Sequence, residues 1–258
     1  MTYMESLLFA LSYFTNLPVP GNPKWSDENA AASLAWLPLT GLAVGLCLLA
    51  FGLFCVSTGF PQYLPLRALL IMAIELWVGG AAFIEGFGKT CDGVFSGLSG
   101  KRGVELTRDS APGRKSVLGL IFILIAKLAL LGELSYREEF VFVVLFYPCW
   151  ARWAYSFAAC NYQVANPEGM AYFFKISQKP IYIIMSSAFT VLTLMLMPSY
   201  FYIGALASFG VVVICCSMVQ SKLGGLNEEN YGLAAVVAEL SFLLFCSASG
   251  YFTFYMGR

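Results

Sequence analysis

Long apolar stretches are the feature of this sequence that most constrains its fold. A bilayer core requires about 20 apolar residues per helix, and only 12% of the residues are charged, against roughly 25% in soluble domains. The sequence therefore predicts an all-α polytopic membrane helical bundle with about seven transmembrane helices, forming a single integral membrane domain over residues 1–258. The predicted spans are 33–57, 66–88, 116–134, 139–160, 180–197, 200–220 and 233–255.

Two segments depart from a simple series of spans. The uncharged stretch 180–221 is too long for one helix, and Pro198 would end the first of two, so it predicts a helical hairpin. The stretch from Leu7 to Phe14 is too short to cross the bilayer and is followed by Pro18 and Pro20. We expect a short N-terminal interfacial helix there, and a poor signal peptide because no Lys or Arg precedes it.

The distribution of Lys and Arg predicts the orientation of the spans, because cytoplasmic loops carry the excess. The poorer side carries three, Arg67, Arg137 and Arg258. The richer side carries ten, namely Lys24, Lys89, Lys101, Arg102, Arg108, Arg114, Lys115, Lys175, Lys179 and Lys222. We expect a multi-pass protein of a bacterial or archaeal inner (plasma) membrane, with the lipid bilayer as its partner and its active face in the cytoplasm.

Two further basic residues, Lys127 and Arg152, lie within or near the ends of predicted spans. An ionisable group in the membrane is costly, so both are candidate functional residues. For Arg152, near a helix end, snorkelling of the side chain to the interface is an equal alternative.

Composition excludes several kinds of chemistry. Histidine is absent, which removes Ser/His and Cys/His catalysis and the commonest zinc site. The formal charge of zero leaves no basic footprint, so no nucleic acid is expected as a partner. The chemistry must rest on carboxylates, amines, hydroxyls or a hard metal ion. Seven of the eight cysteines lie in apolar runs without metal-ligand spacing and are expected to be small buried residues: Cys47, Cys55, Cys149, Cys160, Cys215, Cys216 and Cys246.

Acidic residues recur in the segments predicted to face the cytoplasm. Mg²⁺ takes hard oxygen ligands and bridges one or two carboxylates to substrate phosphates, and neighbouring basic residues suit an anionic substrate. The alternative is that these charges are simply solvated. The acidic residues are Glu85, Asp92, Asp109, Glu168, Glu228 and Glu229.

Glu85, Lys89 and Asp92 are spaced to lie on one face of a helix. In one interpretation Lys89 forms salt bridges with both neighbours, and the stripe is structural or takes the place of a cation. In the other, Glu85 and Asp92 bind Mg²⁺ and Lys89 contacts phosphate. An ammonium between two carboxylates competes with a divalent ion, which favours the first interpretation.

Gly41 and Gly45 are four residues apart in the first span, a spacing that permits close helix packing. The partner is either a second copy, which predicts a homo-oligomer, or another helix of the same chain.

Short motifs with matching span positions run through most of the chain. Together they resemble the cobalamin synthase family, membrane-bound adenosylcobinamide-GDP ribazoletransferases. The motifs are Phe14-Thr15-Asn16-Leu17-Pro18-Val19-Pro20, Pro38-Leu39-Thr40-Gly41 with Gly45, Thr90-Cys91-Asp92-Gly93-Val94-Phe95, Arg108-Asp109-Ser110 with Gly113, Lys127 in the next span, Glu168-Gly169, and Gly224-Gly225 with Gly232 and Glu239.

The resemblance implies a transfer reaction with Mg²⁺ as cofactor. A hydroxyl of α-ribazole (or its phosphate) would attack the cobinamide-bearing phosphorus of adenosylcobinamide-GDP, giving adenosylcobalamin and releasing GMP. The implied catalytic residues are Glu85, Asp92, Lys89 and Arg108. The implied metal ligands are Asp92, Asp109, Glu85 and Glu229. The implied substrate-binding residues are Lys127, Arg152, Glu168 and Gly225.

The chain departs from the family's pattern within these motifs. Phe83 stands where the family has histidine, Lys89 where it has aspartate, and Ala111 where it has arginine. These changes raise an alternative, a catalytically impaired homologue that binds corrinoid or a partner enzyme. A small-molecule transporter is a second alternative, against which the polar residues gather at one membrane face rather than at the midplane.

Overall fold

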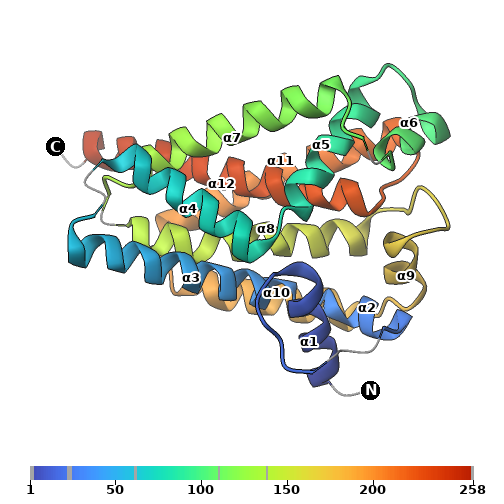
Figure 1. The fold of residues 1–258 in the computed structure, drawn as a ribbon, viewed down its shortest axis with the longest axis horizontal. Helices are drawn as coiled ribbons and strands as arrows, with labels where there is room; N and C mark the ends of the chain where they lie inside the picture. The colour runs from blue at the N-terminus through green and yellow to red at the C-terminus, as the bar shows by residue number, and fades with distance from the viewer. Residues whose placement is uncertain (1–2, 22–24, 61–62, 110, 138, 257–258) are drawn as a thin grey trace.

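The computed structural model describes residues 3–21, 25–60, 63–109, 111–137 and 139–256. Most of the long helices run along the long axis of the molecule (Figure 1). No strand occurs within the described ranges, so the prediction of an all-α fold is confirmed. Lys24 and Arg258 lie outside these ranges. The helices are α1 (Tyr3–Phe14), α2 (Asp27–Ser33), α3 (Leu37–Thr58), α4 (Leu64–Gly79), α5 (Ala82–Phe95), α6 (Gly100–Thr107), α7 (Arg114–Leu134), α8 (Phe140–Asn161), α9 (Met170–Ile176), α10 (Pro180–Met195), α11 (Tyr200–Leu223) and α12 (Glu228–Met256).

The apolar helices match most of the predicted spans. Within the described part of the chain, α3, α7, α8, α11 and α12 are long and apolar enough to cross a membrane, and the bent pair of α4 and α5 brings the number to six. The seventh predicted span corresponds to α10, whose 16 residues are fewer than the roughly 20 that a bilayer core needs. The predicted break at Pro198 is confirmed, because α10 ends at Met195 and α11 begins at Tyr200. The chain is a multi-pass membrane protein.

The predicted continuous span 66–88 is wrong in one respect, because it is broken into α4 and α5. The two helices meet at an angle of 93°. Gly80 lies at the break with φ +74°, a conformation that residues with a Cβ rarely adopt. As a result α5 turns away from α4 towards α6 (Figure 1) and carries Glu85, Lys89 and Asp92 on a separate helix.

Asn16 closes the C-terminal end of α4. The last carbonyls of a helix have no partner within it, and inside a membrane an unpaired carbonyl is costly. Asn16 donates its backbone N–H to Val78 O at 2.8 Å and its side-chain amide to Trp77 O at 2.7 Å. The motif 14–20 at the end of α1 therefore stabilises the break between α4 and α5.

Helix α8 forms the centre of the bundle and is mostly buried. A Cβ on Gly41 would clash with the backbone of Pro148 and Cys149, and one on Gly45 with the backbone of Leu145. The two glycines therefore allow α3 and α8 of the same chain to pack closely. This is the second alternative, a contact with another helix of the same chain. The buried positions expected for the cysteines are confirmed for Cys55, Cys149, Cys160, Cys216 and Cys246, whereas Cys47 and Cys215 are half-buried.

Candidate active site

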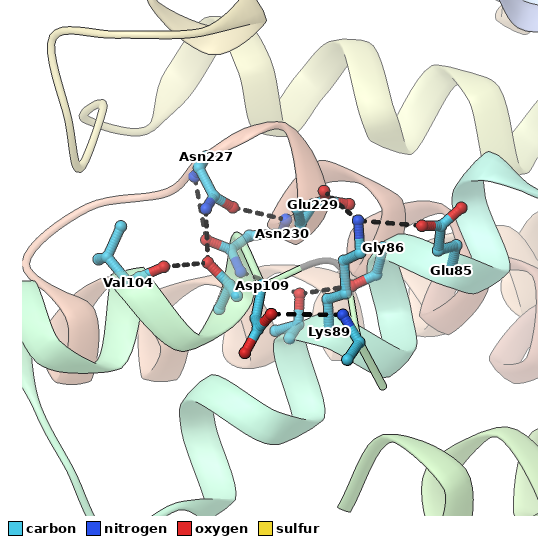
Figure 2. A network of polar contacts seen from close by, with 11 residues as sticks. Glu85, Gly86, Lys89, Val104, Asp109, Asn227, Glu229 and Asn230 are labelled. Atoms are coloured by element: carbon cyan, nitrogen blue, oxygen red, sulfur yellow. Dashed lines mark hydrogen bonds and ion pairs between the residues drawn. The ribbon is translucent and has the colours of Figure 1, made fainter. Parts of the chain in front are cut away.

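The first turn of α12 is fixed against α5 and α6 by two asparagines (Figure 2). The backbone N–H of Asn227 donates to Asn230 Oδ1 at 2.9 Å, and the backbone N–H of Asn230 donates to Asn227 Oδ1 at 3.1 Å. The Asn227 amide also donates to Thr107 Oγ1 at 2.6 Å, and the Asn230 amide donates to Thr90 Oγ1 at 2.9 Å. This reciprocal cap places the acidic first turn of α12 beside α5, an arrangement that the sequence analysis missed.

Lys89 joins α5 to α12 through two carboxylates (Figure 2). Its Nζ lies 2.9 Å from Glu85 Oε1 and 3.0 Å from Glu229 Oε1. The Lys89 side chain is 17% exposed and that of Glu229 20%, whereas Glu85 is 60% exposed. The predicted salt bridge from Lys89 to Glu85 is confirmed, and its second partner is Glu229 from a distant segment.

Asp92 has a different function in the fold, since it caps the N-terminus of α7. Its Oδ2 accepts the N–H of Gly113 at 2.7 Å, and its Oδ1 accepts those of Lys115 and Ser116 at 3.1 and 2.9 Å. A carboxylate is favourable there because the free N–H groups of a helix N-terminus carry partial positive charge. The interpretation in which Lys89 forms salt bridges with both neighbours is therefore wrong for Asp92, which bonds to the backbone of α7 and the preceding loop.

The loop residues of the predicted site form local contacts. Arg108 and Glu168 pair with each other at 3.1 Å, and both are exposed. Asp109 Oδ1 accepts the backbone N–H of Ala111 at 3.3 Å. These contacts tie the loop after α6 to the loop before α9.

Gly225 lies where two backbone segments meet. Leu226 exchanges backbone hydrogen bonds with Gln163 and Ala165 at 2.7 and 2.9 Å, and a Cβ on Gly225 would lie 2.5 Å from Ala165 N. Close backbone approach accounts for glycine here, and the substrate-binding role of Gly225 stays a prediction.

A pocket of about 180 Å³ opens beside the Lys89 cluster. Burial, followed by the charges of Glu228 and Glu229, raises the pKa of Tyr13, so its hydroxyl stays a neutral donor in the pocket. Glu228 is held by the N–H of Ala171 at 3.3 Å. The residues that line the pocket are Tyr13, Phe14, Ala82, Phe83, Glu85, Lys89, Tyr155, Glu228 and Glu229.

Lys127 lies deeper in the bundle, in an ionic cluster. It forms ion pairs with Glu75 of α4 and Glu239 of α12, and Tyr147 donates its hydroxyl to Glu75 Oε2 at 2.7 Å. Glu75 was not among the residues predicted from the sequence, although a lone acid inside an apolar stretch is the signal that marks it.

Arg152 is also buried, with 2% of its surface exposed. Snorkelling to the interface, one of the two interpretations of Arg152, is therefore wrong. Its guanidinium donates to Pro148 O at 3.2 Å and lies 5.1 Å from the centre of the Phe83 ring. Phe83 also lines the pocket, whereas Arg152 does not, so Arg152 contacts the pocket wall through the Phe83 ring.

The four predicted Mg²⁺ ligands do not fit one metal ion as they are placed. Glu85 and Glu229 converge on Lys89, Asp92 bonds to three backbone N–H groups, and Asp109 bonds within its own loop. No group of three or more Asp, Glu, Cys or His side chains among the described residues is arranged to hold a metal ion.

Comparison with known proteins shows which family the chain belongs to. The family model for cobalamin-5-phosphate synthase matches residues 6–247. The adenosylcobinamide-GDP ribazoletransferase of Escherichia coli (strain K12) is 30% identical over 254 residues, covering 93% of this chain and 99% of the relative. The enzyme of the same name from Shigella boydii serotype 4 is 31% identical over 251 residues, with the same coverage. No solved structure matches the chain. Because the family match spans nearly the whole chain, the protein belongs to the cobalamin-5-phosphate synthase family.

Proposed function

We propose that this protein is an adenosylcobinamide-GDP ribazoletransferase, which joins α-ribazole to adenosylcobinamide-GDP and gives adenosylcobalamin and GMP. The observation that carries the proposal is the charged pocket between α5 and α12 in a chain of this family. Family membership does not favour the transporter alternative.

In the proposed reaction one P–O bond forms and one breaks. The α-ribazole hydroxyl oxygen attacks the cobinamide-bearing phosphorus, and GMP leaves with the electron pair of the broken bond. Glu85 is the proposed general base for the hydroxyl proton, because it lines the pocket and its side chain is 60% exposed. Lys89 faces the same pocket and would stabilise negative charge on the phosphoryl oxygens.

The positions of the other predicted site residues decide the roles that we propose for them. Arg108 and Glu168 form an exposed pair, which we assign to the rim that contacts the substrate. Arg152 packs against the Phe83 ring, and Lys127 belongs to the ionic cluster. We assign both residues to support of the pocket wall. Asp92 positions α7. The predicted Mg²⁺ has no fitting ligand set here, and no step is assigned to it.

We also propose that the pocket faces the cytoplasm of a bacterial or archaeal inner (plasma) membrane. The segments that the charge distribution assigns to this side carry ten of the fifteen Lys and Arg residues, an excess that is typical of the cytoplasmic side. A homo-oligomer stays a prediction.

The test is GMP release from adenosylcobinamide-GDP and α-ribazole by protein purified in nanodiscs. We expect release by the natural chain and a loss of about 10²-fold or more in Glu85→Gln, because the general base is removed. Glu105→Gln is the matched control, since Glu105 is an exposed carboxylate of α6 outside the pocket.

Binding of adenosylcobinamide-GDP without GMP release would contradict the proposal. That result would support the catalytically impaired alternative. Equal rates in Glu85→Gln and Glu105→Gln would remove Glu85 from the reaction.

A further inference from the structure

We infer that the Lys89 ammonium takes the place of a divalent cation at the centre of this site, so that no metal ion binds between Glu85 and Glu229. The positive charge that faces the substrate phosphate is then part of the polypeptide. This consequence for catalysis rests on the proposed function, whereas the inference about metal binding stands on the geometry alone.

The first support is the point at which the two carboxylates converge. Glu85 belongs to α5 and Glu229 to the first turn of α12, yet Oε1 of each lies within 3.0 Å of the same nitrogen, Lys89 Nζ (Figure 2). Mg²⁺ would bind such oxygens at about 2.0–2.1 Å and requires a near-octahedral set of ligands. An ammonium between the same two oxygens excludes that ion by occupying its position and by charge repulsion.

The second support is that the packing of α5 against α12 holds this arrangement in place. A Cβ on Gly86 would lie 2.7 Å from Glu229 O, so the backbones of the two helices are in direct contact there. One turn along, Asn230 donates to Thr90 at 2.9 Å. Lys89 lies between these two contacts in sequence, and its side chain is 17% exposed. The ammonium is therefore held in place within the interface between α5 and α12.

The third support comes from the neighbouring carboxylates. Asp92 accepts three backbone N–H groups of the loop and first turn of α7, and Glu228 accepts the N–H of Ala171. Neither adds a third ligand to Glu85 and Glu229, in keeping with the lack of a three-carboxylate group in the described residues.

Lys89 also has the donor that the proposed role requires. An ammonium has three N–H donors, and the two carboxylates account for two of them. Lys89 lines the pocket, so the third donor serves a phosphate oxygen of the bound substrate. Because this cation is part of the chain, the site does not have to bind a metal ion from solution to place a positive charge beside the phosphate.

The test measures Mn²⁺ binding by electron paramagnetic resonance, with the full chain in phosphatidylcholine nanodiscs and no substrate present. Mn²⁺ is used as the spectroscopic substitute for Mg²⁺, and the zwitterionic lipid avoids binding to the membrane. We expect no saturable site in the natural chain. Lys89→Asp removes the ammonium from the convergence point and adds a third carboxylate on the same face of α5, so we expect it to gain one bound Mn²⁺ per chain.

Two controls make the result specific. Adding Glu229→Gln to Lys89→Asp is expected to weaken Mn²⁺ binding about tenfold or more, because it removes the negative charge of one ligand. Lys101→Asp makes the same charge change at an exposed position of α6 and is expected to gain no site. Size-exclusion elution reports whether each variant is folded.

Two results would overturn the inference. One is saturable Mn²⁺ binding by the natural chain that is lost in Glu85→Gln or Glu229→Gln, a comparison that holds even if Lys89→Asp fails to fold. The other is a folded Lys89→Asp variant that gains no Mn²⁺. If the natural chain binds no Mn²⁺ at this point and also releases no GMP, the proposed function fails while the inference about Lys89 is supported.

Discussion

At the scale of single residues, the acidic side chains divide between fold and pocket according to their hydrogen-bond partners. Asp92 accepts backbone N–H groups on both oxygens and is half-buried, whereas Glu85 is 60% exposed beside the pocket. Both residues belong to α5 and lie seven positions apart. Their sequence spacing predicted that they share a helix face. The packing of α7 and α12 against α5 decided which groups each carboxylate contacts.

Asp92→Asn is expected to destabilise the protein by about 1–2 kcal/mol, because the amide loses the charge that interacts with the N-terminus of α7 and retains one accepting oxygen. Asp109→Asn is the matched control, since Asp109 accepts one N–H in an exposed loop. Thermal unfolding in detergent measures both. Equal midpoints for the two variants would show that the cap contributes nothing.

At the scale of elements, the break between α4 and α5 positions the pocket. A straight helix through 66–88 would keep Glu85 and Lys89 along the direction of α4, whereas the 93° bend directs α5 towards α6 and α12. Gly80 permits the bend through its positive φ, and Asn16 pairs with the carbonyls that end α4. Local backbone chemistry and a cap from a distant segment thus act together.

Gly80→Ala is expected to cost about 1–3 kcal/mol of stability, because a residue with a Cβ is strained at φ +74° and ψ 160°. The rate of GMP release should also fall, since α5 carries Glu85 and Lys89. Gly52→Ala tests the same chemical change inside α3, where a Cβ would meet no atom within 4 Å; it should leave the rate unchanged and raise stability by about 0.5–1 kcal/mol, because alanine favours a helix interior over glycine. A Gly80→Ala protein that matches Gly52→Ala would contradict this account of the bend.

At the scale of the whole molecule, a buried ionic cluster connects four helices of the bundle, two of which, α8 and α12, also line the pocket. Lys127 of α7 pairs with Glu75 of α4 and Glu239 of α12, and Tyr147 of α8 donates to Glu75. A buried charge is tolerated only when it is paired and hydrogen-bonded. The cluster therefore requires these four helices to assemble in one arrangement.

Lys127→Met is expected to destabilise the bundle by about 3–5 kcal/mol, because two buried carboxylates lose their shared cation. Glu133→Gln breaks the more exposed pair with Arg137, and we expect it to cost about 0.5 kcal/mol or less. Chemical unfolding of the purified proteins distinguishes the two. Similar costs would show that the buried cluster is no more important than a surface pair.

The sequence by itself determined the membrane class, the positions of most spans and the family, because apolar length and short motifs are local properties of the chain. It also placed Glu85 and Lys89 on one helix, since their spacing of four matches the helical repeat. Only the tertiary structure decided that Glu229 completes the Lys89 cluster, that Asp92 caps α7, and that the second span is broken. These features depend on contacts between residues up to 140 positions apart, and helical periodicity carries no information about which distant side chains meet.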